Sequence, residues 1–70
     1  MKYAIMKVSN GNFAIESEWS ELDKAIVNFH TVCTTLWNAP DVVKACVAIV
    51  REDMAIEKCE YVKYNTQQNS

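Results

Sequence analysis

The segments of this chain that are expected to form strands carry apolar residues on both of their faces. Each apolar face of a sheet needs cover, and the 70-residue chain has one segment with helical periodicity. One helix covers one face of a small sheet, so the second apolar face requires a partner, most simply a second copy of the chain. The sequence therefore predicts how the protein associates more directly than it predicts a biochemical role.

The dipeptide Asn10-Gly11 predicts the turn of a first hairpin. Extended runs over residues 2–9 and 12–19 flank it, and Gly11 is the only glycine in the chain. Asn-Gly favours a two-residue turn because both central positions need positive φ. The resulting register pairs Val8 with Phe13, Met6 with Ile15 and Ala4 with Ser17. The residues expected to face the helix are Ala4, Met6, Val8, Phe13 and Ile15, which leaves Tyr3 and Ile5 on the uncovered face.

Residues 21–37 have the periodicity of an amphipathic helix. Apolar side chains recur at steps of three and four, at Leu22, Ala25, Ile26, Phe29, Cys33 and Leu36. Ser20 followed by Asp23 resembles a capping box, and Pro40 prevents continuation of the helix. This segment is the one expected to cover the sheet.

A second hairpin is predicted from strands over residues 42–50 and 54–64. A two-residue loop at Glu52-Asp53 pairs Cys46 with Cys59, although Glu-Asp lacks the residues that a tight turn prefers. One face then carries Val43, Ala45, Val47, Ile49, Ile56 and Val62. The other face carries Cys46, Ala48, Val50, Ala55, Cys59 and Tyr61. We expect the first set to face the helix, and the reverse assignment stays open.

The predicted fold is a two-layer α+β ββαββ domain over residues 1–64, followed by a disordered polar tail over 65–70. An antiparallel sheet of two hairpins is covered on one face by the single helix. The order of the strands stays open, because both hairpins can pair through either edge. The predicted contact surface consists of Tyr3, Ile5, Cys46, Ala48, Val50, Ala55, Cys59 and Tyr61.

Composition disfavours several classes of partner. Seven Lys and Arg face nine Asp and Glu, for a net charge of −2, without the basic stripe typical of nucleic-acid binders. The chain has no apolar run of about 18 residues, so we expect no membrane span. We expect no signal peptide, because Lys7 interrupts the apolar residues near the N-terminus, and three cysteines are an odd number for a secreted disulfide framework. We therefore expect a cytoplasmic protein.

Few residues suggest catalytic or metal chemistry. A zinc site of Cys33, Cys46, Cys59 and His30 can be drawn, but the paired ligand spacing of structural zinc sites is missing. A disulfide between Cys46 and Cys59 competes with two reduced thiols, which the cytoplasm favours. One glycine cannot build a phosphate-binding loop or a nucleophile elbow. We expect no metal, no cofactor, no catalytic residue and no enzymatic activity.

Two stretches of the chain carry a resemblance to known proteins. Residues 1–13, which begin Met1-Lys2-Tyr3-Ala4-Ile5, and residues 36–50, which begin Leu36-Trp37-Asn38-Ala39-Pro40, resemble a group of small uncharacterised proteins. Members of this group occur in gut Firmicutes and in their phages and mobile elements. The resemblance covers most of residues 1–57 and brings no known site residue. It implies a small accessory protein that acts by binding a host protein or a signalling molecule.

Three functions from different classes follow. The leading one is a non-enzymatic accessory protein that forms a homodimer through its open sheet face or an edge strand, binds a protein partner and interferes with a host system. A second is a module that sequesters a nucleotide-like ligand between protomers, with contacts from Lys7, Asn12 and His30. A third is a weak single-stranded nucleic-acid binder that stacks bases on Tyr3 and Tyr61, for which the charge gives little support.

Overall fold

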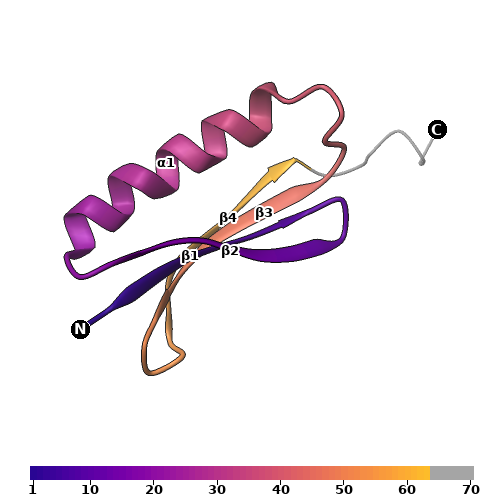
Figure 1. Cartoon of the computed structure of the whole chain (residues 1–70). Helices are drawn as coiled ribbons and strands as arrows, with labels where there is room; N and C mark the ends of the chain where they lie inside the picture. Colours follow the sequence, from indigo (N-terminus) through magenta and orange to yellow (C-terminus); the bar gives the residue numbers. More distant parts are fainter. Residues whose placement is uncertain (64–70) are drawn as a thin grey trace.

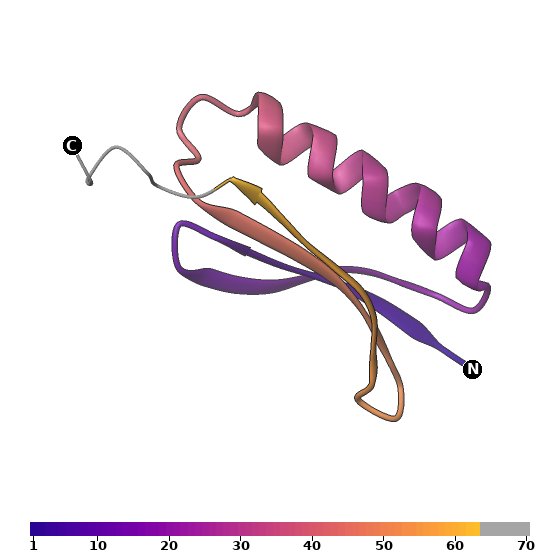
Figure 2. The ribbon, with the colours of Figure 1, turned by 180° about the vertical axis from the view of Figure 1, so that it is seen from behind.

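The computed structural model describes residues 1–63 and has the predicted ββαββ order. Its elements are β1 (Tyr3–Ser9), β2 (Asn12–Trp19), α1 (Leu22–Asn38), β3 (Ala45–Arg51) and β4 (Ile56–Lys63). The strands form one antiparallel sheet in the order β2-β1-β3-β4. Helix α1 runs along one side of this sheet, as both views show (Figures 1 and 2). The α+β fold class is confirmed, while the predicted tail and the last residue of the predicted final strand, Tyr64, lie outside the described residues.

The first hairpin has the predicted turn and one unpredicted irregularity. Asn10 and Gly11 have φ angles of 52° and 86°, as the Asn-Gly turn requires. Val8 pairs with Phe13 and Met6 with Ile15, but the next pair is Ile5 with Ser17. Glu16 is therefore an extra residue in β2, a β-bulge, and it reverses the alternation of the strand beyond it.

The second hairpin has a longer loop than predicted, so its predicted register is wrong. Cys46 pairs with Tyr61 instead of Cys59, and Cys59 pairs with Ala48. The amide of Arg51 donates to the carbonyl of Ala55 at 2.8 Å, which closes the loop. Met54 adopts a φ of 73° inside it. Glu-Asp does not favour the two positive φ angles of a tight hairpin turn, so the chain turns over more residues.

The core lies between α1 and the two central strands, β1 and β3. Its buried side chains are Ile5, Ala25, Phe29, Val32, Leu36, Ala45, Val47 and Ile49. The predicted burial of Ala45, Val47 and Ile49 is confirmed. The prediction for the first hairpin is wrong, because Ile5 is fully buried whereas Phe13 is 78% exposed.

The position of α1 explains why Ile5, and not Phe13, is on the buried side of the first hairpin. The bulge at Glu16 directs Ser17 and Trp19 to the side opposite Phe13 and Ile15. The Ser17 hydroxyl donates to the Asn28 side-chain oxygen of α1 at 2.7 Å, and the Trp19 indole donates to Ser17 Oγ at 2.8 Å. Helix α1 follows Trp19 after two residues, so it covers the side on which these residues lie, which is also the side of Ile5.

The termini of α1 also differ from the prediction in detail. Glu21 is the N-terminal cap residue and makes no side-chain capping bond, so the predicted capping box at Ser20 does not form. At the other end, the Ala39 amide donates to the Leu36 carbonyl at 3.3 Å, directly before Pro40. The helix therefore ends at Asn38, one residue beyond the predicted end at residue 37, since proline disfavours helical conformation in the residue before it.

Hydrogen bonds from two other parts of the chain hold the connection between α1 and β3. Asn10 Nδ2 donates to the carbonyl of Asp41 at 3.0 Å, and Asn10 Oδ1 accepts from the amide of Val43 at 2.9 Å. Lys63 Nζ donates to the carbonyls of Ala39 and Val42 at 2.7 and 2.9 Å. The first turn and the end of β4 therefore hold this loop in place by satisfying its backbone groups.

Candidate functional site

The side of the sheet opposite α1 is apolar, and we call it the open face. Its members are Ala4, Met6, Val8, Phe13, Ile15, Cys46, Ala48, Val50, Ile56, Cys59 and Tyr61. They form cross-strand rows, such as Phe13–Val8–Cys46–Tyr61 and Ile15–Met6–Ala48–Cys59. No element within residues 1–63 covers this face (Figures 1 and 2).

The exposed apolar area is large for so small a domain. Phe13 is 78% exposed and Tyr61 73% exposed, and they lie on β2 and β4, the two edge strands. At about 150–250 Å² for a whole aromatic side chain, these two alone present on the order of 300 Å². The largest apolar patch of a typical monomer is about 300–600 Å² in total. Ile15 and Ile56 are also largely exposed. The apolar area of the open face is therefore larger than about 300 Å², the lower limit of this range.

Charged residues lie mainly at the margins of the open face. A third row, Glu18–Ala4–Val50–Ile56, places one carboxylate at a corner of the sheet. Lys7 and Glu16 form an ion pair of 2.9 Å, with Lys7 in the strand position between Met6 and Val8 and hence on the other side of the sheet. The centre of the open face is thus free of charge, which lowers the cost of removing it from water.

Ion pairs close the loop at one end of the sheet. The Arg51 guanidinium binds the Asp53 carboxylate and lies 3.7 Å from Glu57. The hydrogen bond from Arg51 and a second from the Ala55 amide lower the pKa of Asp53 below its ordinary value. These charges stabilise the loop outside the apolar rows.

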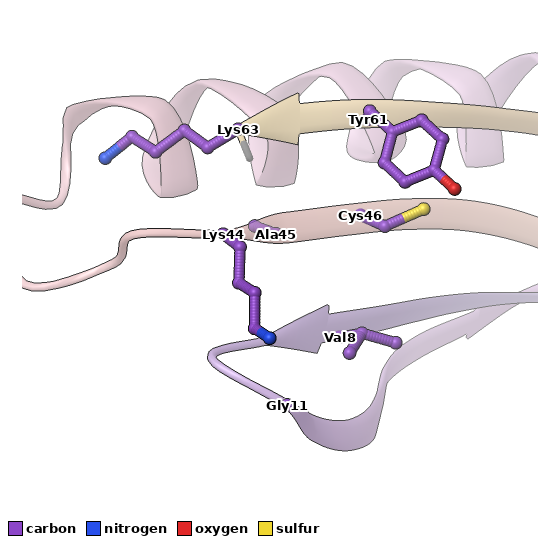
Figure 3. A pocket seen from close by; sticks show the side chains of 7 residues that line it. All are labelled: Val8, Gly11, Lys44, Ala45, Cys46, Tyr61 and Lys63. Atoms are coloured by element: carbon purple, nitrogen blue, oxygen red, sulfur yellow. The ribbon is translucent and has the colours of Figure 1, made fainter. Parts of the chain in front are cut away.

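Two shallow hollows interrupt the open face. The first, of about 250 Å³, lies between the first turn and the start of β3, and Val8, Cys46 and Tyr61 line its apolar part. Figure 3 shows Tyr61 and Cys46 side by side on neighbouring strands, with Lys44 reaching toward the first hairpin. The second, of about 380 Å³, lies at the opposite end of the sheet, where Met6 and Ile15 contribute to its lining. Both are open depressions that side chains of a second molecule can fill.

The open face contains a pair of thiols. Cys46 Sγ and Cys59 Sγ lie 3.6 Å apart, on β3 and β4. Partial burial and the neighbouring Cys59 thiol raise the pKa of Cys46 to about 11. Cys33 packs against the core on α1, on the opposite side of the sheet, and burial raises its pKa as well.

The zinc site considered from the sequence, at Cys33, Cys46, Cys59 and His30, does not form within the described residues. Cys33 is separated from Cys46 and Cys59 by the sheet itself. Within residues 1–63, no three or more His, Cys, Asp and Glu side chains are grouped so that they could hold a metal ion. The three cysteines therefore divide into a pair on the open face and a single residue beneath the helix.

The predicted contact residues fall into three groups. Cys46, Ala48, Val50, Cys59 and Tyr61 lie on the open face, as expected. The placement of Tyr3 and Ile5 on the uncovered face is wrong: Ile5 is in the core and Tyr3 packs against it, because the bulge reverses which side of the hairpin meets α1. Ala55 lies in the loop before β4 and is exposed. Their role in an interface remains a prediction.

The sequence reasoning missed several residues of the open face. They are Ala4, Met6, Val8, Phe13, Ile15 and Ile56. The polar run Glu16-Ser17-Glu18 after Ile15 breaks the apolar alternation, and that break was the available signal for a bulge. The bulge at Glu57 similarly moves Ile56 away from the core side.

The groups suggested for other ligands are not brought together. Tyr3 lies on the side of α1 and Tyr61 on the open face, so they do not form one stacking platform. Lys7 is paired with Glu16, while Asn12 lies at the hairpin turn and His30 on the exposed part of α1. The open face is thus the surface with the most coherent chemistry in the described part of the chain.

Known proteins give no guide to the role of this surface. The chain matches no family model, no curated protein and no solved structure at a significant level. Within the described residues, the helix is neither long nor apolar enough to cross a membrane. The function is therefore inferred from the residues of the chain itself.

Proposed function

We propose that this protein is a non-enzymatic accessory protein that forms a homodimer by packing the open faces of two copies together. The observation that carries the proposal is the continuous apolar surface of the three cross-strand rows, with large exposed side chains at Phe13 and Tyr61. Sheets pack face to face at a spacing of about 10 Å, with the side chains of both inner faces interdigitating. A second copy supplies an equal and matching apolar area.

The edge strands favour association through the face over association through an edge. The bulge at Glu16 interrupts β2, and bulges at Glu57 and Val62 interrupt β4. Lys58 and Lys63 add charge along β4. Bulges and lysines on edge strands are devices that hinder pairing with another chain. The open face carries no comparable obstacle at its centre.

Sedimentation velocity over a concentration series tests the dimer directly. The full-length protein is expected to change from monomer to dimer between low micromolar and high micromolar concentration. Ile15→Asp places a charge in the row Ile15–Met6–Ala48–Cys59 of the open face and should abolish the dimer. Val27→Asp is the matched control, since Val27 is an exposed apolar residue on α1. A wild-type protein that stays monomeric at high micromolar concentration would contradict the proposal.

We further propose that the dimer binds a protein partner. The sequence resemblance suggests that this partner is a host protein. The exposed outer side of α1 supports this step, because Trp37 and Val27 are apolar and well exposed there. Tryptophan is enriched among residues that dominate binding energy at interfaces. A pull-down with Trp37→Ala beside the wild type tests it: a partner that is retained equally by both would rule out this surface.

A further inference from the structure

We propose that Cys46 and Cys59 form an oxidisable dithiol that closes into an intrachain disulfide linking β3 to β4 on the open face. The two Sγ atoms are already 3.6 Å apart. A disulfide needs a separation of about 2.05 Å, so the sulfurs must approach by roughly 1.5 Å. Diagonal neighbours on adjacent strands, such as this pair, lie about 7–8 Å apart, at the upper limit of disulfide geometry, so closure requires a small shift of β4 toward β3 as well as side-chain rotation.

The arrangement of the strands makes this pair selective. Cys46 pairs with Tyr61 and Ala48 with Cys59, so the two cysteines are diagonal neighbours on one face of adjacent strands. Cys33 lies on the other side of the sheet and cannot reach either sulfur without unfolding of the core. Oxidation of the folded protein is therefore expected to leave Cys33 as a free thiol.

Exposure sets the order of the steps. Cys59 is exposed and Cys46 is half-buried. With a small disulfide such as oxidised glutathione as the oxidant, the thiolate of Cys59 attacks one glutathione sulfur. A mixed disulfide forms at Cys59, and one glutathione thiolate leaves and takes up a proton. Cys46 then loses its proton and attacks Cys59 Sγ, which releases the second glutathione as a thiol.

The complete reaction exchanges the disulfide of oxidised glutathione for a disulfide in the protein. Two protein thiols are oxidised to one protein disulfide, and one molecule of oxidised glutathione is reduced to two thiols. Burial of Cys46 disfavours its thiolate and raises its pKa, which slows ring closure at neutral pH and lets the mixed disulfide accumulate. Ring closure is expected to accelerate as the pH rises.

The disulfide would stabilise the attachment of the edge strand β4 to the sheet. It ties β4 to β3 and closes the loop that contains the irregular turn at Met54. A cross-link of this kind restricts the unfolded chain, so the melting temperature should rise by on the order of 10 °C. The reaction takes place within one chain and does not require the proposed dimer.

The test uses the full-length protein at submicromolar concentration with excess oxidised glutathione. Peptide mapping under non-reducing conditions is expected to find Cys46 linked to Cys59, with Cys33 free. Cys46→Ala should stop at the mixed disulfide on Cys59, and Cys33→Ala should react like the wild type. Circular dichroism before oxidation verifies that each variant is folded.

Two results would overturn the inference. One is a wild-type protein in which Cys46 and Cys59 remain free or glutathionylated at equilibrium, and the other is a Cys59–Cys59 link between two chains. Sedimentation of the reduced and the oxidised protein at high micromolar concentration keeps the two proposals separate. An intrachain disulfide in a protein that never dimerises supports this inference alone, and a dimer without the disulfide supports only self-association.

Discussion

The two faces of this sheet are both apolar, yet only one is buried. Ile5 on β1 lies under α1, while Met6 and Val8 on the same strand belong to the open face. The covered side has Val47 and Ile49 at its centre and polar groups at its margin. The open side has the larger exposed side chains, at Phe13 and Tyr61. Apolar content therefore does not decide which face the helix takes; the short connection after Trp19 and the hydrogen bond from Ser17 to Asn28 of α1 do.

The strongest test of this difference replaces one isoleucine on each face. Ile5→Ala is expected to lower the free energy of unfolding by about 2–5 kcal/mol, because it leaves a cavity in a packed core. Domains of this size have about 4–10 kcal/mol in total, so this variant should be close to unfolding. Ile15→Ala should change monomer stability by less than about 0.5 kcal/mol. Chemical denaturation at low protein concentration measures both, and equal losses would mean that the open face is packed in the monomer.

Two neighbouring polar residues in β2 provide a second, smaller test. Ser17→Ala removes the bond to Asn28 and leaves the half-buried Trp19 indole without this acceptor, at a cost of about 1–3 kcal/mol. Glu18→Ala, on the open side, should be within about 0.5 kcal/mol of the wild type. Thermal unfolding of the two variants in parallel gives the comparison. A larger effect at Glu18 would contradict the position of the bulge.

The loop at the edge of the open face is expected to be the place where a substitution stabilises the protein. Met54 has positive φ, which costs a residue with a side chain roughly 1 kcal/mol. Met54→Gly should relieve this and raise the free energy of unfolding by about 0.5–1 kcal/mol. Ala55→Gly is the control, since Ala55 is exposed and does not have positive φ, and glycine there should destabilise. Urea unfolding distinguishes the two signs.

The smallest effect concerns the ion pair at the same loop. The Arg51 guanidinium lowers the pKa of Asp53 in the folded state, so the carboxylate stabilises the fold above its unfolded pKa of about 3.9. This contribution is lost as the pH falls through the depressed folded pKa. Wild type and Asp53→Asn should therefore differ slightly in melting temperature at pH 7 and converge near pH 2. A difference that grows on acidification would contradict this assignment.

The fold class was predictable because its signals are local. Asn10-Gly11 specifies a turn through the φ angles that it tolerates, and the spacing of residues in α1 specifies an amphipathic helix. Three residues of β3 were also assigned to the correct side. Each of these inferences uses interactions among residues that are close in the sequence.

The faces and registers were harder because they depend on irregular positions. A single extra residue, Glu16, exchanges the sides of everything that follows it in β2. The second hairpin depends on a left-handed Met54, which no residue preference indicates. The open face was therefore predicted correctly in β3 and in part of β4, and incorrectly in the first hairpin. The thiol pair came close in space through a diagonal contact instead of the predicted direct pairing.

The strand order β2-β1-β3-β4 has a consequence for synthesis on the ribosome. β1 is synthesised first but lies between β2 and β3 in the sheet. The backbone groups on one of its edges therefore stay unpaired until β3, which begins at Ala45, has been synthesised. Until then, a nascent chain ending within α1 presents a hairpin with an unfilled strand edge. Pairing of strands that lie so far apart along the chain is intrinsically slow, because the entropy of closing the loop is lost before the contacts form. Chains that stall in α1 are accordingly the species most exposed to aggregation, and the arrival of β3 ends that exposure.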